Sequence, residues 1–67
     1  MELSARNQLR GTVKSVTAEG LTAEVVVEVG GQEIASTITR ASAQPLGLKK
    51  GDAVLAIIKA SDVLIAK

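Results

Sequence analysis

The chain has 67 residues and a formal charge of +1 from eight basic and seven acidic side chains, with no cysteine, histidine or aromatic residue. Without thiols and imidazoles it lacks the usual ligands of zinc, copper and iron, the usual nucleophile and base pairs of enzymes, and any disulfide. The balanced charge gives no electrostatic footprint for duplex nucleic acid, and no apolar run approaches the roughly 20 residues of a membrane span.

Alternation of apolar and polar residues with a period of two predicts three strands in the first forty residues. The first begins at Leu9, runs to Val16 or Thr17, and is turned by Glu19-Gly20. The second, Leu21 to Val29, places its apolar face on the odd-numbered positions. Gly30-Gly31 predicts a hairpin because type I′ and II′ turns need positive φ, and a third strand follows from Gln32 to Thr39.

A helical turn and two further strands are expected in the second half. Ser42 to Gly47 predicts one helical turn, with Ser42 as the N-cap, Pro45 in the first turn and Gly47 at the exit. The turn at 49–52 leads into a strand from Ala53 to Ile58, whose two apolar faces predict cover on both sides. After a polar step, Val63 to Ala66 is expected to form a fifth strand.

This order of elements predicts one all-β domain over residues 1–67, a five-stranded OB-like Greek-key barrel with one short helical turn between strands 3 and 4. Such a small domain, lacking disulfides, metal ligands and aromatic side chains, is marginally stable by itself. The apolar surface of its last two strands exceeds what one barrel can bury. We therefore expect an obligate oligomer, in which neighbouring subunits cover some of Val26, Leu55, Ile57, Leu64 and Ile65.

Two polar segments interrupt the strand pattern near opposite ends of the chain, SARNQL at 4–9 and KASDV at 59–63. Hydroxyls, a guanidinium, an ammonium and small residues that leave backbone N–H groups accessible are the donors that a tetrahedral oxyanion requires. We expect cationic contacts from Arg6 and Lys59, hydroxyl donors from Ser4 and Ser61, and exposed N–H groups at Ala5 and Ala60.

Several polar residues inside and outside these segments have more than one interpretation. Ser42 is a weaker anion candidate at a helix N-terminus, where a plain N-cap is the favoured explanation. Asn7 is as suited to pin a turn through its side chain as to contact a ligand. Arg6 without the Lys59 segment is explained by a surface ion pair, and Asp62 is expected to point away from the site or to brace Lys59.

Three segments resemble the molbindins, single Mop or TOBE-type domains that bind molybdate: SARNQLRGTV at 4–13, ITRASAQPLGLKKGD at 38–52 and AIIKASDVLIA at 56–66. The first and last are specific, whereas LGLKKGD is a structural turn of many barrels. The resemblance implies an OB-like barrel, a homohexamer built as a trimer of dimers, and molybdate or tungstate held at subunit interfaces. It supports the SAR and KAS positions as ligands of the intact oxyanion, with no metal coordinated directly and no organic cofactor.

The leading hypothesis is a cytoplasmic protein that stores molybdate or tungstate for molybdenum homeostasis and catalyses no reaction. One alternative is a nucleic-acid-binding OB module, which the lack of aromatic side chains and of a basic stripe disfavours. Another is a regulatory TOBE domain derived from a molybdate transporter ATPase or a molybdate-responsive regulator. Met1, three residues before Ser4, favours a free-standing protein.

Overall fold

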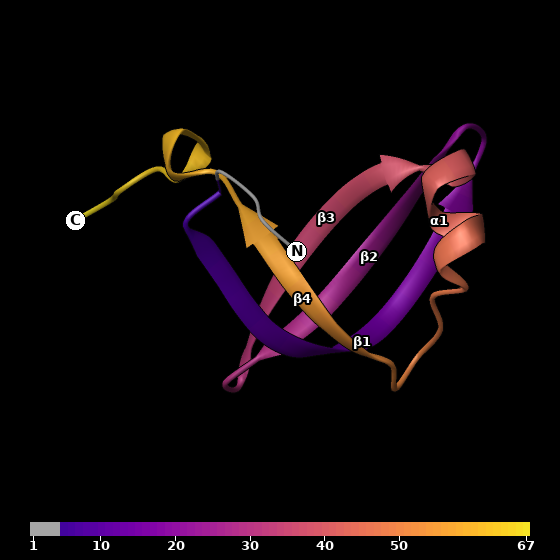
Figure 1. Ribbon diagram of the computed structural model, residues 1–67, viewed down its shortest axis with the longest axis horizontal. Helices are drawn as coiled ribbons and strands as arrows, with labels where there is room; N and C mark the ends of the chain where they lie inside the picture. The colour runs from indigo at the N-terminus through magenta and orange to yellow at the C-terminus, as the bar shows by residue number, and fades with distance from the viewer. Residues whose placement is uncertain (1–4) are drawn as a thin grey trace.

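Residues 5–67, which the computed structural model describes, form a curled sheet of four antiparallel strands and one short α-helix (Figure 1). The strands β1 (Asn7–Glu19), β2 (Thr22–Val29), β3 (Gln32–Thr39) and β4 (Ala53–Ile58) lie in the order β3-β2-β1-β4. Helix α1 (Arg40–Leu46) joins β3 to β4, and a 3-10 helix, η1 (Ala60–Asp62), follows β4. The sheet is a half-barrel whose open side lies between β3 and β4.

The first three strands form the meander that the alternation predicts. β3 has the predicted bounds, and Gly30 and Gly31 turn the hairpin with φ angles of 56° and 82°, as a type I′ turn requires. β1 is longer than expected, because it pairs with β2 toward Glu19 and with β4 back to Asn7. Leu21 belongs to the turn rather than to β2, and its side chain is 87% exposed.

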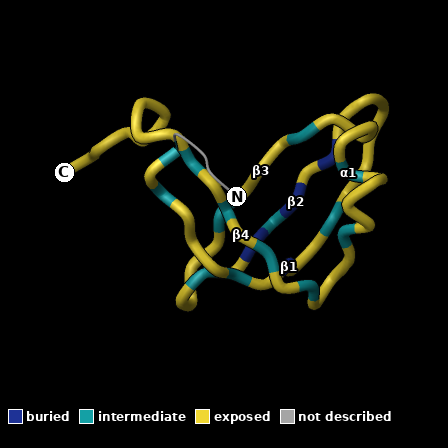
Figure 2. Tube along the Cα trace, viewed as in Figure 1, coloured by how far each residue is buried: buried dark blue, intermediate teal, exposed yellow. Residues whose placement is uncertain are grey.

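The core is small and lies on the concave face of this meander. Its buried members are Val13, Ala23, Val25 and Val27, and Figure 2 shows the buried residues concentrated along β2. The predicted apolar face of the second strand is thus confirmed by the alternating burial of β2. Partly buried residues that pack against the core are Val16, Val29, Ile38, Leu48 and Val54.

Two features of β1 allow it to curl across both β2 and β4. A Cβ atom on Gly11 would lie 2.6 Å from the Glu28 carbonyl oxygen and 2.6 Å from Val27 Cγ1, so any side chain here would obstruct the approach of β2. A register shift between Val13 and Ser15 marks a β-bulge, which increases the local bend. Glycine and bulge together bring the start of β1 round to β4.

The predicted helical turn exists, but its N-cap is wrong. Thr39 caps α1 in an extended conformation, and its Oγ1 accepts a hydrogen bond from the Ser42 backbone N–H at 3.1 Å. The helix starts this early because Arg40 N–H donates to the Leu21 carbonyl at 2.8 Å, which holds the first helical residue against the β1–β2 turn. Pro45 consequently lies in the last turn, and Gly47 ends the helix with φ 58°, as predicted.

The predicted fifth strand does not form within the described chain. Residues 63–67 pair with no strand and extend away from the sheet beyond η1 (Figure 1). They remain unpaired because η1 redirects the chain as soon as β4 ends, so no neighbouring strand is available to them. Leu64 and Ile65 are 92% and 90% exposed. Within the described residues the five-stranded barrel is therefore a four-stranded half-barrel.

The second face of β4 is uncovered in one chain. Val54, Ala56 and Ile58 are half-buried, whereas Leu55 and Ile57 are exposed. Of the five residues expected to face another subunit, Val26 is half-buried and Leu55, Ile57, Leu64 and Ile65 are exposed. Their cover by a neighbour stays a prediction. None of the helices in the described chain has the length and hydropathy needed to cross a membrane.

Candidate functional site

The two polar segments of the sequence meet at one end of the sheet. β1 and β4 are antiparallel, and Asn7 pairs with Ile58, so Ala5 and Arg6 lie beside the residues that follow Ile58. The Asn7 side chain reinforces this pairing, because its Nδ2 donates to the Ile58 carbonyl at 3.2 Å across 51 residues of sequence. The fold therefore brings the Arg6 segment next to the Lys59 segment within a single chain.

The Asn7 amide bonds to a distant strand end and not to a local turn. Asn7 is half-buried, and its side chain holds the last residue of β4, whereas the sequence suggested a turn or a ligand contact. The N-terminal segment is folded back by a second amide, since Gln8 Nε2 donates to the Ala5 carbonyl at 3.3 Å. These two hydrogen bonds orient the backbone on either side of Arg6, whose side chain is exposed.

The C-terminal half of the site is built on η1. The N–H groups of Asp62 and Val63 bond to the carbonyls of Lys59 and Ala60, at 2.9 and 3.3 Å. The N–H groups of Ala60 and Ser61 precede these bonds, and a 3-10 helix provides no internal acceptor for them. η1 therefore presents adjacent backbone donors together with the Ser61 hydroxyl and the Lys59 ammonium.

This end of the sheet carries two exposed cations and the exposed carboxylate of Asp62. Arg6, Lys59, Ala60 and Ser61 are all exposed, and Ala5 is half-buried. Within residues 5–67 the recorded ion pair joins Lys14 to Glu33, so neither cation of the site pairs with a described carboxylate. The expected brace between Asp62 and Lys59 is absent from this part of the chain. The arrangement can donate hydrogen bonds to an anion, but it does not enclose one.

Two other predicted site residues are not brought into this cluster. Ser4 lies outside the described residues. Ser42 lies on α1, at the opposite end of the sheet from η1 (Figure 1), and its Oγ accepts a hydrogen bond from Thr39 Oγ1 at 2.8 Å. No cluster of three or more histidine, cysteine, aspartate or glutamate residues suited to a metal ion occurs among the described residues.

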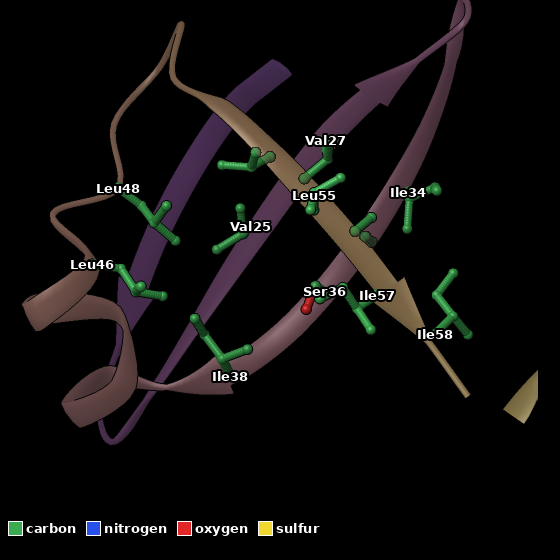
Figure 3. A pocket seen from close by; sticks show the side chains of 13 residues that line it. Val25, Val27, Ile34, Ser36, Ile38, Leu46, Leu48, Leu55, Ile57 and Ile58 are labelled. Carbon is green, nitrogen blue, oxygen red and sulfur yellow. The ribbon is translucent and has the colours of Figure 1, made fainter. Parts of the chain in front are cut away.

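Sequence reasoning missed a cleft on the open side of the half-barrel. It has a volume of about 500 Å³ and lies between β3 and β4, with β2 as its floor and the segment after α1 at one end (Figure 3). None of the oxyanion candidates in residues 5–67 lines it. Its wall is apolar apart from Ser36, with Val25, Val27, Ile34, Ala35, Ile38, Leu46, Leu48, Val54, Leu55, Ala56, Ile57 and Ile58 as the other members. Two apolar faces on β4 were the signal that pointed to such a surface.

Comparison with known proteins is informative over almost the whole chain. A family model described as the TOBE domain matches residues 3–65. The chain is 47% identical over 66 residues to molybdenum-pterin-binding protein 3 of Clostridium pasteurianum, covering 97% of each chain.

Two solved structures share the fold. A molybdate-binding protein from Sporomusa ovata superposes with a TM-score of 0.95 at 36% identity, over 100% of both chains. The cytoplasmic molybdate-binding protein ModG, in a form with molybdate bound, superposes with a TM-score of 0.90 at 46% identity, over 96% of this chain and 46% of ModG. The likeness thus extends over the whole half-barrel.

Proposed function

The chain belongs to the TOBE domain family, and on that premise we propose that it binds molybdate as the intact oxyanion. The observation that carries this proposal is the pairing of Asn7 with Ile58, which sets Ala5 and Arg6 beside the KAS segment. Two cations, the Ser61 hydroxyl and the backbone N–H groups at the start of η1 are then available at one end of the sheet. Full-length similarity to molybdate-binding proteins supports the choice of anion.

Each part of the site has a distinct role. Arg6 and Lys59 supply the positive charge, and the Ser61 hydroxyl and the N–H groups around Ala60 supply directed hydrogen bonds. Ser4 and Ala5 contribute a second hydroxyl and backbone donor, while Asn7 positions the segment through Ile58. Ser42 joins this site from a neighbouring copy, because in one chain α1 and η1 lie at opposite ends of the sheet.

The energy that binding requires explains why one chain is insufficient. A micromolar dissociation constant corresponds to about 8 kcal/mol, and a hydrogen bond to a charged group contributes about 1.5–3 kcal/mol. About four such bonds are a minimum, because the ligand also loses freedom of motion. Donors that stay exposed, as Arg6, Lys59 and Ser61 do here, are also hydrogen-bonded to water. We propose that the sites lie at interfaces of the homohexamer, a trimer of dimers, that the resemblance to the molbindins implies, where a neighbour excludes water.

Selectivity against phosphate requires that the Asp62 carboxylate on η1 point away from the bound anion, so that the site contains donors alone. Phosphate near neutral pH carries a proton that needs an acceptor, and a site made of donors offers none. Tungstate has the charge and shape of molybdate and binds at the same site. Sulfate is smaller, and the size of the pocket lowers its affinity. The protein thereby stores molybdate or tungstate in the cytoplasm, with no organic cofactor and no catalysed reaction.

Calorimetric titration of the assembled protein with molybdate, tungstate, sulfate and phosphate tests this function. We expect tight binding of the first two anions and weak or no binding of the others. Absence of molybdate binding would falsify the proposal, and sulfate binding of equal strength would reduce the site to a general anion site. Molybdate is also expected to raise the melting temperature more than equimolar chloride does, because a ligand that recognises the assembled state stabilises it.

A further inference from the structure

One carboxylate lies among the cations at the end of the sheet that holds η1. Asp62 is the third residue of η1 and directly follows Ser61, so it belongs to the same short helix as the donors of the KAS segment (Figure 1). We propose that Asp62 is the affinity-limiting residue of the oxyanion site: its negative charge opposes the bound dianion, weakens binding and speeds release. This inference rests on the proposed function and deepens it.

The backbone of Asp62 stabilises η1 and contributes no donor to an anion. Its N–H group donates to the Lys59 carbonyl at 2.9 Å, whereas the N–H groups of Ala60 and Ser61 precede that bond. The side chain of Asp62 is therefore what this residue adds to the site. An ionised carboxylate only accepts hydrogen bonds, and so does an unprotonated oxyanion. Between these two groups only repulsion remains.

The fold itself gives the Asp62 carboxylate no structural bond. Asp62 is exposed, and its carboxylate makes no hydrogen bond or ion pair with any other residue of the range 5–67. Asp52 shows what a structural aspartate does in this chain, because its Oδ2 accepts from Lys49 N–H at 3.0 Å and closes the turn before β4. The charge of Asp62 therefore acts on the anion site beside it rather than on the stability of the turn.

The charge of Asp62 reaches the anion without a direct contact. Consecutive Cα atoms are about 3.8 Å apart, so this carboxylate lies within about 10 Å of an anion held at Ser61 N–H. The Debye length is about 10 Å in 0.1 M salt and about 30 Å in 0.01 M salt, so screening is weak at low salt. Arg6 and Lys59 bring two positive charges to this end of the sheet, and the Asp62 charge lowers the sum to one.

The same carboxylate has opposite effects on the empty and the loaded site. In the empty site it is attracted to the nearby cations, Arg6 and Lys59, whereas in the loaded site it is close to a dianion that repels it. Asp62 therefore stabilises the empty state relative to the loaded state. Differences in affinity between related complexes lie mostly in the dissociation rate, so we expect the charge to act chiefly on release. Faster release suits a storage protein, whose cargo has to leave again.

Asp62→Asn tests the inference, because asparagine keeps the size of the side chain and removes its charge. In about 0.01 M salt we expect molybdate to bind about fourfold more tightly, the effect of a unit charge on a dianion about 10 Å away in water. Calorimetry of the assembled protein measures the affinity. Release of radioactive molybdate into excess unlabelled anion measures the dissociation rate, which is expected to fall by a similar factor. Both changes should shrink in about 1 M salt.

Two further variants separate the charge at this position from other causes. Asp62→Glu keeps the charge and is expected to bind molybdate as the unsubstituted protein does. Glu24→Gln removes a charge from β2, where Glu24 pairs with Thr17, ten residues along β1 from Asn7, and is expected to change the affinity much less. A gain of affinity in Asp62→Glu as large as in Asp62→Asn, or an equal gain in Glu24→Gln, would overturn the inference.

Competition by phosphate distinguishes a charge acting at a distance from a direct contact. We expect phosphate to gain affinity for Asp62→Asn by about the same factor as molybdate. Weaker competition by phosphate would mean that the carboxylate accepts the proton of phosphate directly, and would overturn the proposed action. Unchanged or weaker molybdate binding by Asp62→Asn would also overturn it, while binding by the unsubstituted protein would leave the proposed function intact. Failure of the unsubstituted protein to bind molybdate would overturn both.

Discussion

The closed and open sides of the half-barrel differ in how far one chain pairs their strands and buries their apolar side chains. On the closed side, β1, β2 and β3 pair through short glycine turns and enclose Val13, Val25 and Val27. On the open side, β3 and β4 leave a cleft of about 500 Å³, two uncovered strand edges and exposed apolar side chains in the described chain. The meander thus buries the core of the single chain, whereas one chain leaves the open side and the adjoining cationic end uncovered.

The closed side is tested most severely at Gly11. Gly11→Ala puts a Cβ atom within 2.6 Å of β2 backbone and side-chain atoms, and we expect a loss of about 1–3 kcal/mol in the free energy of unfolding. Denaturant unfolding measures the loss. Thr12→Ala, an exposed neighbour on the same strand, is the matched control and is expected to change stability much less. Equal stability of both variants would mean that β1 does not approach β2 so closely.

The cationic end adjoining the open side is tested by removing its charges. Arg6→Ala and Lys59→Ala are each expected to weaken molybdate binding by at least about 1.5 kcal/mol, roughly tenfold, because each removes a charge-assisted hydrogen bond. Calorimetry provides the affinities. Arg10→Ala removes an exposed cation four residues farther along β1 and serves as the control, with affinity expected to be unchanged. If Arg10→Ala weakens binding as much as Arg6→Ala, general charge rather than the paired segments holds the anion.

The junction between the two sides depends on the cap of α1. Thr39→Ala removes the Oγ1 that accepts from Ser42 N–H, and we expect it to cost about 1 kcal/mol of stability. Ser42→Ala keeps that backbone donor and is expected to cost less. Thermal unfolding of the two variants decides between them. A larger loss from Ser42→Ala would restore Ser42 as the residue that matters at this helix start.

The smallest effect is expected at the exposed ion pair on the outer surface. The Glu33 carboxylate raises the pKa of Lys14, and Glu28 adds to this in the same direction. A raised folded-state pKa stabilises the fold below the ordinary lysine pKa of 10.5, and this contribution disappears as the pH rises through the folded value. Glu33→Gln should therefore change the melting temperature slightly near neutral pH, and by less still in high salt. A loss as large as that of Gly11→Ala would show that the pair contributes more than its exposure suggests.

Local patterns predicted the closed side well, because their causes act within a few residues. Period-two alternation located β2, the Gly30-Gly31 hairpin signal located β3, and an apolar run located β4; positive φ at both glycines follows from the demands of a two-residue hairpin. The helix was found, but its cap was misplaced by three residues. In the sequence, Thr39 is equally compatible with the end of a strand. The hydrogen bond from Arg40 N–H to the Leu21 carbonyl, which fixes the start of the helix, joins residues that are far apart in the chain.

The sequence alone was enough to predict the meander, its turns, the apolar excess of the last segments and the two polar segments suited to an oxyanion. The tertiary structure alone decided that Asn7 meets Ile58, that Ser42 lies far from η1, and that residues 63–66 leave the sheet. The two kinds of feature differ in the sequence distance over which their causes act. Alternation and turn chemistry are properties of neighbouring residues, whereas the partner of an edge strand is set by which distant segments the curled sheet brings within hydrogen-bonding distance.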